Sequence, residues 1–355
     1  WSAAASAVSQ PPVGHRTPGF NGTGTISDPT GTISEGAPGG GDVTIQFANG
    51  LYDGSGGTLY ITGAQAGIVV TVYKGGISND SAAFTVEPAV LDSFTVEAQG
   101  GGSIGTQAAD TAFNIDITAY DVYGNVLSSG PNEFVGTVDI SDTTTTIAPV
   151  VSGVFVAGVR TESVQVTQAA VGDVITVTNS AGVETGASNA FTVVPGVLDH
   201  FTFDLQPVAT YEAGEGIAVR IFAEDVQGNL KSGYTQGVTV SDSTGTISEG
   251  APGSGDTVIT FTNGVYNAGA AANLFVTQAA AGVTITVTDG AVIDSSNAFD
   301  VEPAVVDYFT VEAQGGGNIG PQVADTAFNI DITAYDQYGN VLSSGVNAFN
   351  DTVEI

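Results

Sequence analysis

The chain has 355 residues and carries 5 Lys and Arg against 37 Asp and Glu, a formal net charge of -32. So acidic a surface repels phosphate groups, which excludes nucleic acid as a partner and disfavours anionic membrane surfaces. Hydrophobic residues make up 42% of the chain, enough for packed cores, but they form no continuous apolar run long enough for membrane insertion.

Residues 1–18 form an N-terminal arm that matches nothing else in the chain. The chain contains neither Cys nor Met and begins at Trp1, its single tryptophan. We therefore expect an extracellular or cell-surface protein, secreted and with its leader removed. For the arm, we weigh a clasp that binds a neighbouring subunit against a frayed terminus.

Residues 19–90 repeat a stretch found later in the chain. TGTISEGAPG occurs at Thr30 and again at Thr244, and FANGLYD at Phe47 matches FTNGVYN at Phe261. The later copies lie in the middle of a longer unit. Residues 19–90 are therefore predicted to be the C-terminal half of a unit.

Residues 91–197 show the periodicity of β-strands most clearly. Phe113, Ile115 and Ile117 alternate with polar residues, as on a strand with one buried face. An Asp-x-x-Gly-Asn turn follows from Asp121 to Asn125, in which Gly provides a positive φ and the polar side chains bond back to the turn. This stretch is predicted to be a complete β-sandwich domain.

Two further units follow. LDSF at Leu91 returns as LDHF at Leu198 and VDYF at Val306, spacings of 107 and 108 residues. Residues 198–305 therefore form a second complete domain. Residues 306–355 match 91–140 with 11 differences over 50 positions, so they are predicted to be the N-terminal half of a unit.

The fold class predicted from these patterns is all-β, with tandem sandwich repeats and no significant helix. The run DITAYDVYGNVLSSG, together with VTQAAVGDVITVTNSAG and SNAFTVVPG, resembles bacterial immunoglobulin-like repeats. Such repeats occur in surface proteins, in adhesins of the invasin and intimin kind, and in S-layer-associated proteins. The resemblance implies an immunoglobulin-like fold, but it does not specify a function, because these modules serve as stalks, adhesive tips and filament subunits.

The two half units are expected to complete each other. A half sandwich exposes an apolar face and unpaired strand edges, which bind other chains. We expect 306–355 of one subunit to complete 19–90 of the next by strand complementation, giving a head-to-tail homopolymer. A fragment cut from a longer array and closure within one chain are the alternatives. The expected interface residues are Phe20, Ile26, Phe328, Ile330, Ile332, Phe349, Val353 and Ile355.

Ca²⁺ is the one cofactor that the sequence suggests. Acidic residues gather at the unit junctions and in the turns, and carboxylates are the ligands that this ion prefers. Solvated acids and turn caps are the competing interpretation. The candidate ligands are Glu87, Asp92, Asp121, Asp225, Glu302, Asp307 and Asp336. Three sequons, at Asn21, Asn79 and Asn350, are glycosylation candidates or chance matches.

No catalytic motif is found, so we do not expect an enzyme. His15 and His200 are the only histidines, and His200 occupies a position held by Ser93 and Tyr308 in the related units. The main hypothesis is a structural subunit of an extracellular filament or surface array. The alternative is a non-polymerising stalk or ligand-binding module of an adhesin, with cell-surface or matrix glycans as partners.

Overall fold

The structure is a computed structural model that describes residues 19–41, 43–54, 57–253, 255–269 and 272–355. It confirms the all-β prediction. The described residues form short strands, and their one helical element is the 3-10 turn η1 (Gly130–Asn132). The N-terminal arm, with Trp1 and His15, lies outside the described residues, so its proposed clasp role stays a prediction.

Contacts group the chain into two compact units. The first comprises residues up to Gly105 together with Ala112–Gln165 and Gly172–Phe191, and the second comprises Thr106–Thr111, Val166–Val171 and Thr192–Ile355. The division does not follow the sequence repeats, since short segments of repeat 91–197 group with the residues that come after it.

The strands of the first unit come from residues 19–90 and from repeat 91–197. Those of residues 19–90 are β1 (Gly22–Ser27), β2 (Ser34–Glu35), β3 (Val43–Phe47), β4 (Leu59–Tyr60), β5 (Gln65–Ile68), β6 (Thr71–Lys74), β7 (Ile77–Asp80) and β8 (Phe84–Val86). Those of the repeat are β9 (Leu91–Ala98), β11 (Phe113–Asp121), β12 (Val138–Asp142), β13 (Val159–Val164), β15 (Ile175–Asn179) and β16 (Thr185–Ala187). Their main sheets have the orders β3-β1-β6-β7, β13-β11-β9 and β12-β15-β16, and β2-β4 and β5-β8 are pairs.

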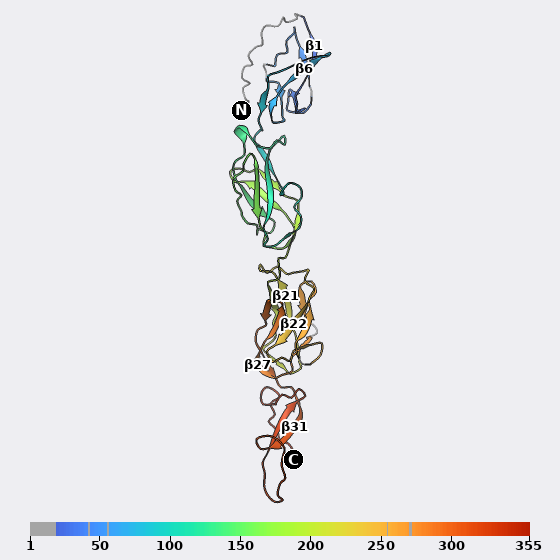
Figure 1. Cartoon of the computed structure of the whole chain (residues 1–355), viewed down its shortest axis with the longest axis vertical. Helices are drawn as coiled ribbons and strands as arrows, with labels where there is room; N and C mark the ends of the chain where they lie inside the picture. Colours follow the sequence, from blue (N-terminus) through green and yellow to red (C-terminus); the bar gives the residue numbers. More distant parts are fainter. Residues whose placement is uncertain (1–18, 42, 55–56, 254, 270–271) are drawn as a thin grey trace. The chain divides into compact units, whose positions relative to one another are not determined.

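Apart from β10 (Gln107–Ala108), which comes from repeat 91–197, the strands of the second unit build repeat 198–305 and a final hairpin (Figure 1). They are β18 (His200–Leu205), β19 (Thr210–Glu212), β20 (Gly216–Ile217), β21 (Arg220–Glu224), β22 (Gly237–Asp242), β23 (Ser248–Glu249), β24 (Thr257–Thr260), β25 (Val265–Asn267), β26 (Leu274–Phe275), β27 (Ala280–Val283), β28 (Ile285–Asp289), β29 (Val292–Ser295), β30 (Phe299–Glu302), β31 (Val306–Ala313) and β32 (Ile330–Asp336). Strands β14 (Ala170–Asp173) and β17 (Phe191–Val194) contribute residues to both units.

In its described residues, repeat 198–305 contains four sheets. Its sheets have the orders β24-β22-β28-β29 and β18-β21-β25, with the smaller sheets β19-β30-β27 and β20-β26-β23 alongside. Alternate residues of each strand are buried, as on Val238 and Val240 of β22, because successive side chains point to opposite faces. They enclose one continuous core that includes Phe201, Tyr234 and Phe261.

Candidate assembly surfaces

The C-terminal hairpin β31–β32 repeats the pairing of β9–β11. Ile332 pairs with Val311 as Ile117 pairs with Val96, and both hairpins carry a register shift near the end that leads to the Asp-x-x-Gly-Asn turn. The hairpin therefore adopts the conformation of a complete repeat without the rest of that repeat.

The face of this hairpin that corresponds to the core is open. Phe309 is 41% and Val311 54% exposed, whereas the equivalent Phe94 and Val96 are 5% and 3% exposed. Ile319 is exposed in the same way, while its equivalent Ile104 is buried. Side chains that a complete repeat buries are thus presented to solvent.

One edge of β32 is also open. In repeat 91–197, β11 pairs with β9 on one side and with β13 on the other. Among the described residues, β32 pairs with β31 alone. It is also shorter, seven residues against nine. In repeat 91–197, the corresponding edge is covered by β13.

Residues 19–90 have an open apolar groove. A groove of ≈ 530 Å³ lies beside the packed rings of Phe20 and Phe47, whose centroids are 5.7 Å apart, and it also contacts Val72 and Asn79. The equivalent rings in repeat 198–305, Tyr234 and Phe261, are also packed together.

In repeat 198–305, a third ring fills the space next to that pair. The Phe201 centroid lies 6.2 Å from that of Tyr234 and 5.4 Å from that of Phe261. Phe309 is the residue of the C-terminal hairpin equivalent to Phe201. The groove of residues 19–90 therefore lies at the position that Phe201 fills in repeat 198–305, and its lining is mainly apolar.

The outer part of residues 19–90 is open as well. Leu59 and Phe84 are exposed, whereas the equivalent Leu274 and Phe299 of the complete repeat are buried. Ile26, Ile33 and Ile45 form a small buried core, against which partly buried apolar residues pack.

The structure distributes the predicted interface residues unevenly. Ile26 is buried in the small core of residues 19–90 and pairs with β3 and β6, so it is not part of an open face. Phe20, Ile330, Ile332 and Phe349 are half-buried, and Phe328, Val353 and Ile355 are exposed.

Sequence reasoning missed four exposed side chains, namely Phe309, Val311, Leu59 and Phe84. The signal was available, because each matches an apolar residue of a complete repeat at a fixed spacing.

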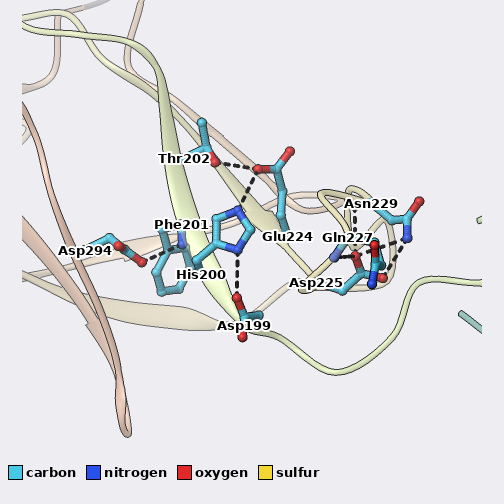
Figure 2. A network of polar contacts seen from close by, with 9 residues as sticks. All are labelled: Asp199, His200, Phe201, Thr202, Glu224, Asp225, Gln227, Asn229 and Asp294. Atoms are coloured by element: carbon cyan, nitrogen blue, oxygen red, sulfur yellow. Dashed lines mark hydrogen bonds and ion pairs between the residues drawn. The ribbon is translucent and has the colours of Figure 1, made fainter. Parts of the chain in front are cut away.

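Polar contacts anchor the start of β18 in the complete repeat (Figure 2). The backbone N–H of Phe201 donates to Asp294 of the edge strand β29 at 2.8 Å. His200 lies on the outer face, with Nδ1 3.1 Å from Asp199 and Nε2 3.4 Å from Glu224. Both of its ring nitrogens thus face carboxylates.

The predicted calcium ligands are not gathered into a cluster. Within the described ranges no group of three or more acidic or His side chains is placed to hold a metal ion. Asp92 and Asp307 are exposed. Glu87 accepts a hydrogen bond from the Ser129 hydroxyl at 2.6 Å, and Glu302 accepts one from Val346 N at 3.1 Å. Calcium binding therefore stays a prediction without a matching ligand set.

The turn aspartates are buried and occupied by hydrogen bonds. Asp121 Oδ1 accepts from the backbone N–H groups of Tyr123 and Asn125, and Oδ2 accepts from Ala89 N and Asn125 Nδ2, all at 2.8–2.9 Å. Burial alone would raise the pKa of Asp121, but these bonds outweigh burial and hold the pKa below 3.8. Asp225 has the same arrangement, and its pKa is lowered for the same reasons.

The three sequon asparagines, Asn21, Asn79 and Asn350, are all exposed. Asn79 lies on the edge strand β7, at the position that Asp294 occupies in repeat 198–305. No helix in the described parts of the chain has the length and apolar character needed to cross a membrane.

No protein-family model matches the chain, and no curated protein matches it significantly. Similar solved structures include domains 4–9 of the surface layer protein SbsC, at 19% identity and a TM-score of 0.23, covering 90% of this chain and 45% of that chain. The D0–D1 domain of intimin is 14% identical with a TM-score of 0.21, covering 59% of this chain and 98% of that one.

The native conformation of E. coli alpha-2-macroglobulin is 12% identical with a TM-score of 0.23, covering 89% of this chain and 24% of that one. The chain thus spans less than half the length of the SbsC fragment and about a quarter of the macroglobulin. At scores of this size, none of these similarities defines what the chain does.

Proposed function

We propose that the chain is a non-catalytic structural module of a cell-surface or extracellular assembly, in which hairpin β31–β32 of one copy completes residues 19–90 of another. One observation carries the proposal. The apolar side chains that a complete repeat buries are exposed on both partial repeats, and each partial repeat has the strands that the other lacks.

The complete repeats specify the strand pairing expected between copies. In repeat 198–305, β21 pairs with β25 so that Ile221 lies opposite Tyr266. The equivalent residues are Ile332 of the hairpin and Tyr52, so these two are expected to lie opposite each other.

A backbone hydrogen bond fixes the same pairing. Ala223 N donates to Gly264 O at 2.8 Å, and Ala119 N donates to Gly158 O at 2.9 Å. In the joined sandwich, Ala334 N is expected to donate to Gly50 O.

The groove beside Phe20 and Phe47 is expected to receive Phe309. By analogy with the bond from Phe201 N to Asp294, the Phe309 N–H would reach the side chain of Asn79. In the complete repeat, Phe201 already packs on the corresponding pair of rings and already makes the corresponding backbone hydrogen bond, which supports the fit of Phe309 in the groove.

The last residues of the chain must move aside on joining. Phe349 packs on Phe309 in the free hairpin, with ring centroids 5.1 Å apart. Phe20 occupies the equivalent place in residues 19–90, where β1 is anchored by pairing with β3 and β6. Because β1 is held by two strands, we expect it to displace residues 349–355.

The joined contact uses different surfaces on its two sides. Such a heterologous contact produces an open filament when its rotation does not close. Closure within one chain would bury the same residues without forming a polymer.

A matched pair of valines tests the proposal. Val311 is exposed here, but its equivalents Val96 and Phe203 are buried. Val305 is exposed, and so are its equivalents Val90 and Val197. We expect Val311→Asp to abolish concentration-dependent assembly, because a carboxylate would be buried without a partner, and Val305→Asp to leave it unchanged.

Assembly is measured by sedimentation velocity over a range of concentrations and by electron microscopy of the full chain. Fibres whose axial repeat matches about three sandwiches support the filament. A chain that stays monomeric at every concentration but protects Val311 from solvent indicates closure within one chain. Monomers in which Val311 stays exposed overturn complementation and leave the non-polymerising stalk.

A further inference from the structure

The Asp-x-x-Gly-Asn turn bonds to residues outside its own repeat at each of its three occurrences. At the first, Asn125 Nδ2 donates to Thr62 O at 2.7 Å, and Asn125 Oδ1 accepts from Ala64 N at 2.9 Å. The side-chain amide thus pairs with the backbone of an earlier loop by two hydrogen bonds, as a neighbouring strand would.

The other two turns reproduce this geometry. Asn229 donates to Thr167 O at 2.8 Å and accepts from Ala169 N at 2.9 Å. Asn340 bonds in the same way, at 2.8 Å each, to the Thr277 carbonyl and the Ala279 N–H. The bonded loop has the sequence Thr-x-Ala in all three cases.

The aspartate of the same turn holds a second segment. Its Oδ2 accepts from the backbone of the linker that precedes the repeat, from Ala89 N at 2.8 Å, Gly196 N at 2.7 Å and Ala304 N at 2.9 Å. The three aspartates, Asp121, Asp225 and Asp336, are 2%, 1% and 0% exposed. Each turn therefore fastens both a loop and a linker through buried bonds.

We propose that this turn is a latch that, within each compact unit, holds the repeat that carries it in a fixed orientation on the loop and the linker to which it bonds, without a metal ion. Attachment at two separate segments opposes both bending and twisting at the joint, which a single bond would not do. The latch at Asn125 lies within the first compact unit, and those at Asn229 and Asn340 lie within the second.

The carboxylate has no capacity left for a metal ion. Asp225 Oδ1 accepts from the backbone N–H groups of Gln227 and Asn229, and Oδ2 accepts from Gly196 N and Asn229 Nδ2. These bonds use about four acceptor positions, the full capacity of a carboxylate. A calcium ion would have to displace them, so the latch takes the place that a calcium site would have at such a joint.

The C-terminal hairpin shows the effect of the latch on a partial repeat. Leu342, close to Asn340, is 5% exposed, although Phe309 of the same hairpin is open to solvent. The end of the hairpin that carries the latch is thus packed even where the sandwich is incomplete. The latch is independent of assembly between copies.

Spin labels on introduced cysteines test the latch in the full chain. The labels attach only at the chosen positions, because the chain has no cysteine of its own. Thr239 on β22 and Glu312 on β31 are exposed strand residues on either side of the third joint, both within the second compact unit, and each is replaced by Cys. The Val311→Asp substitution is included to keep the chain monomeric. Pulsed dipolar spectroscopy then gives the distribution of the distance between the labels.

We expect a narrow distribution that widens at least twofold in Asn340→Ala. Asn329→Ala is the matched control and should leave the width unchanged, because Asn329 bonds to Gln314 within one repeat, at 3.0 Å. Asn340→Asp is nearly isosteric and should also widen the distribution, since it sets a second carboxylate against Asp336 in place of a donor.

Neither a chelator nor added Ca²⁺ should change the width for the unsubstituted latch. An unchanged width in both Asn340 variants, with native circular dichroism, overturns the latch. Widening on chelation that Ca²⁺ reverses also overturns it and assigns the joint to a metal ion.

Discussion

Asp173 occupies a position that is apolar in the other repeats. The equivalents are Val283 and Ile68, both fully buried, and Asp173 itself is 1% exposed. Its Oδ1 accepts hydrogen bonds from Thr143 N and Val174 N, but its Oδ2 is buried without a partner. Burial, together with the nearby Asp142 carboxylate, raises the pKa of Asp173.

Replacing Asp173 by valine should therefore stabilise repeat 91–197. Removing a buried acceptor without a partner is worth about 1–3 kcal/mol, and burying a valine side chain about 1.5–3 kcal/mol. Little is lost in return, because Thr143 N also donates to Val174 O and Val174 N also donates to Thr143 Oγ1. We expect a gain of about 3 kcal/mol at pH 7, or about 10–20 °C in melting temperature.

The gain should depend on pH. Because the pKa of Asp173 is raised on folding, the wild-type carboxyl is tolerated below its unfolded value of 3.8 and becomes destabilising as pH rises through the folded value. The difference between Asp173→Val and wild type should thus grow from pH 3 to pH 7.

Urea unfolding followed by hydrogen exchange of peptides from each repeat separates this repeat from its neighbours. The reciprocal change, Val283→Asp, should destabilise repeat 198–305 by a similar amount. A loss of stability in Asp173→Val at pH 7 would refute the reasoning, because it would mean that the carboxylate is satisfied.

Two further predictions use the same assay. Phe261→Ala should destabilise repeat 198–305 by about 3–5 kcal/mol, because the ring is 1% exposed and packs on three others. The equivalent Phe47→Ala should cost about half as much in dilute chain, since the Phe47 ring is half-buried; equal losses would mean that residues 19–90 are already a complete core. The lowered pKa of Asp225 predicts that its stabilisation is present above pH 3.8 and lost as pH falls through the folded value. Asn229→Ala should weaken this acid dependence, and an unchanged acid profile would argue against the bonds to the carboxylate.

Much of the fold could be predicted from the sequence because the repeats align with one another. Period-two alternation around Ile115 and Ile117 located a strand, and the Asp-x-x-Gly-Asn pattern located the turn after it. The partners of that turn could not be predicted, because Asn125 bonds to a loop 63 residues earlier. The sequence therefore leaves two interpretations of the aspartates open, calcium ligands or solvated acids and turn caps, and in the structure Asp121 accepts hydrogen bonds from its own turn and from the linker.

The candidate interface was predicted in outline but not in detail. Phe328 and Ile332 were predicted as interface residues. Phe328 is exposed and lies outside β32, whereas Ile332 lies on β32 and is half-buried. Ile26 was included because it lies on the strand shared by both halves, yet pairing on both sides buries it. Asp173 differs in the sequence from its equivalents Val283 and Ile68. The structure adds that this carboxylate is buried, which makes the difference unfavourable for stability.

The matching register of β31–β32 and β9–β11 has a consequence for synthesis of the chain. Residues 306–355 differ from 91–140 at 11 of 50 positions, so the later hairpin could pair wrongly with the rest of repeat 91–197. Translation proceeds at about 5–20 residues per second, and domains generally fold in the order in which they emerge. Repeat 91–197 is complete well over 100 residues before the second hairpin leaves the ribosome, a delay of about 8–30 s at these rates. The order of the repeats along the gene thus protects the chain from mispairing with itself, whereas refolding from denaturant exposes both hairpins at once.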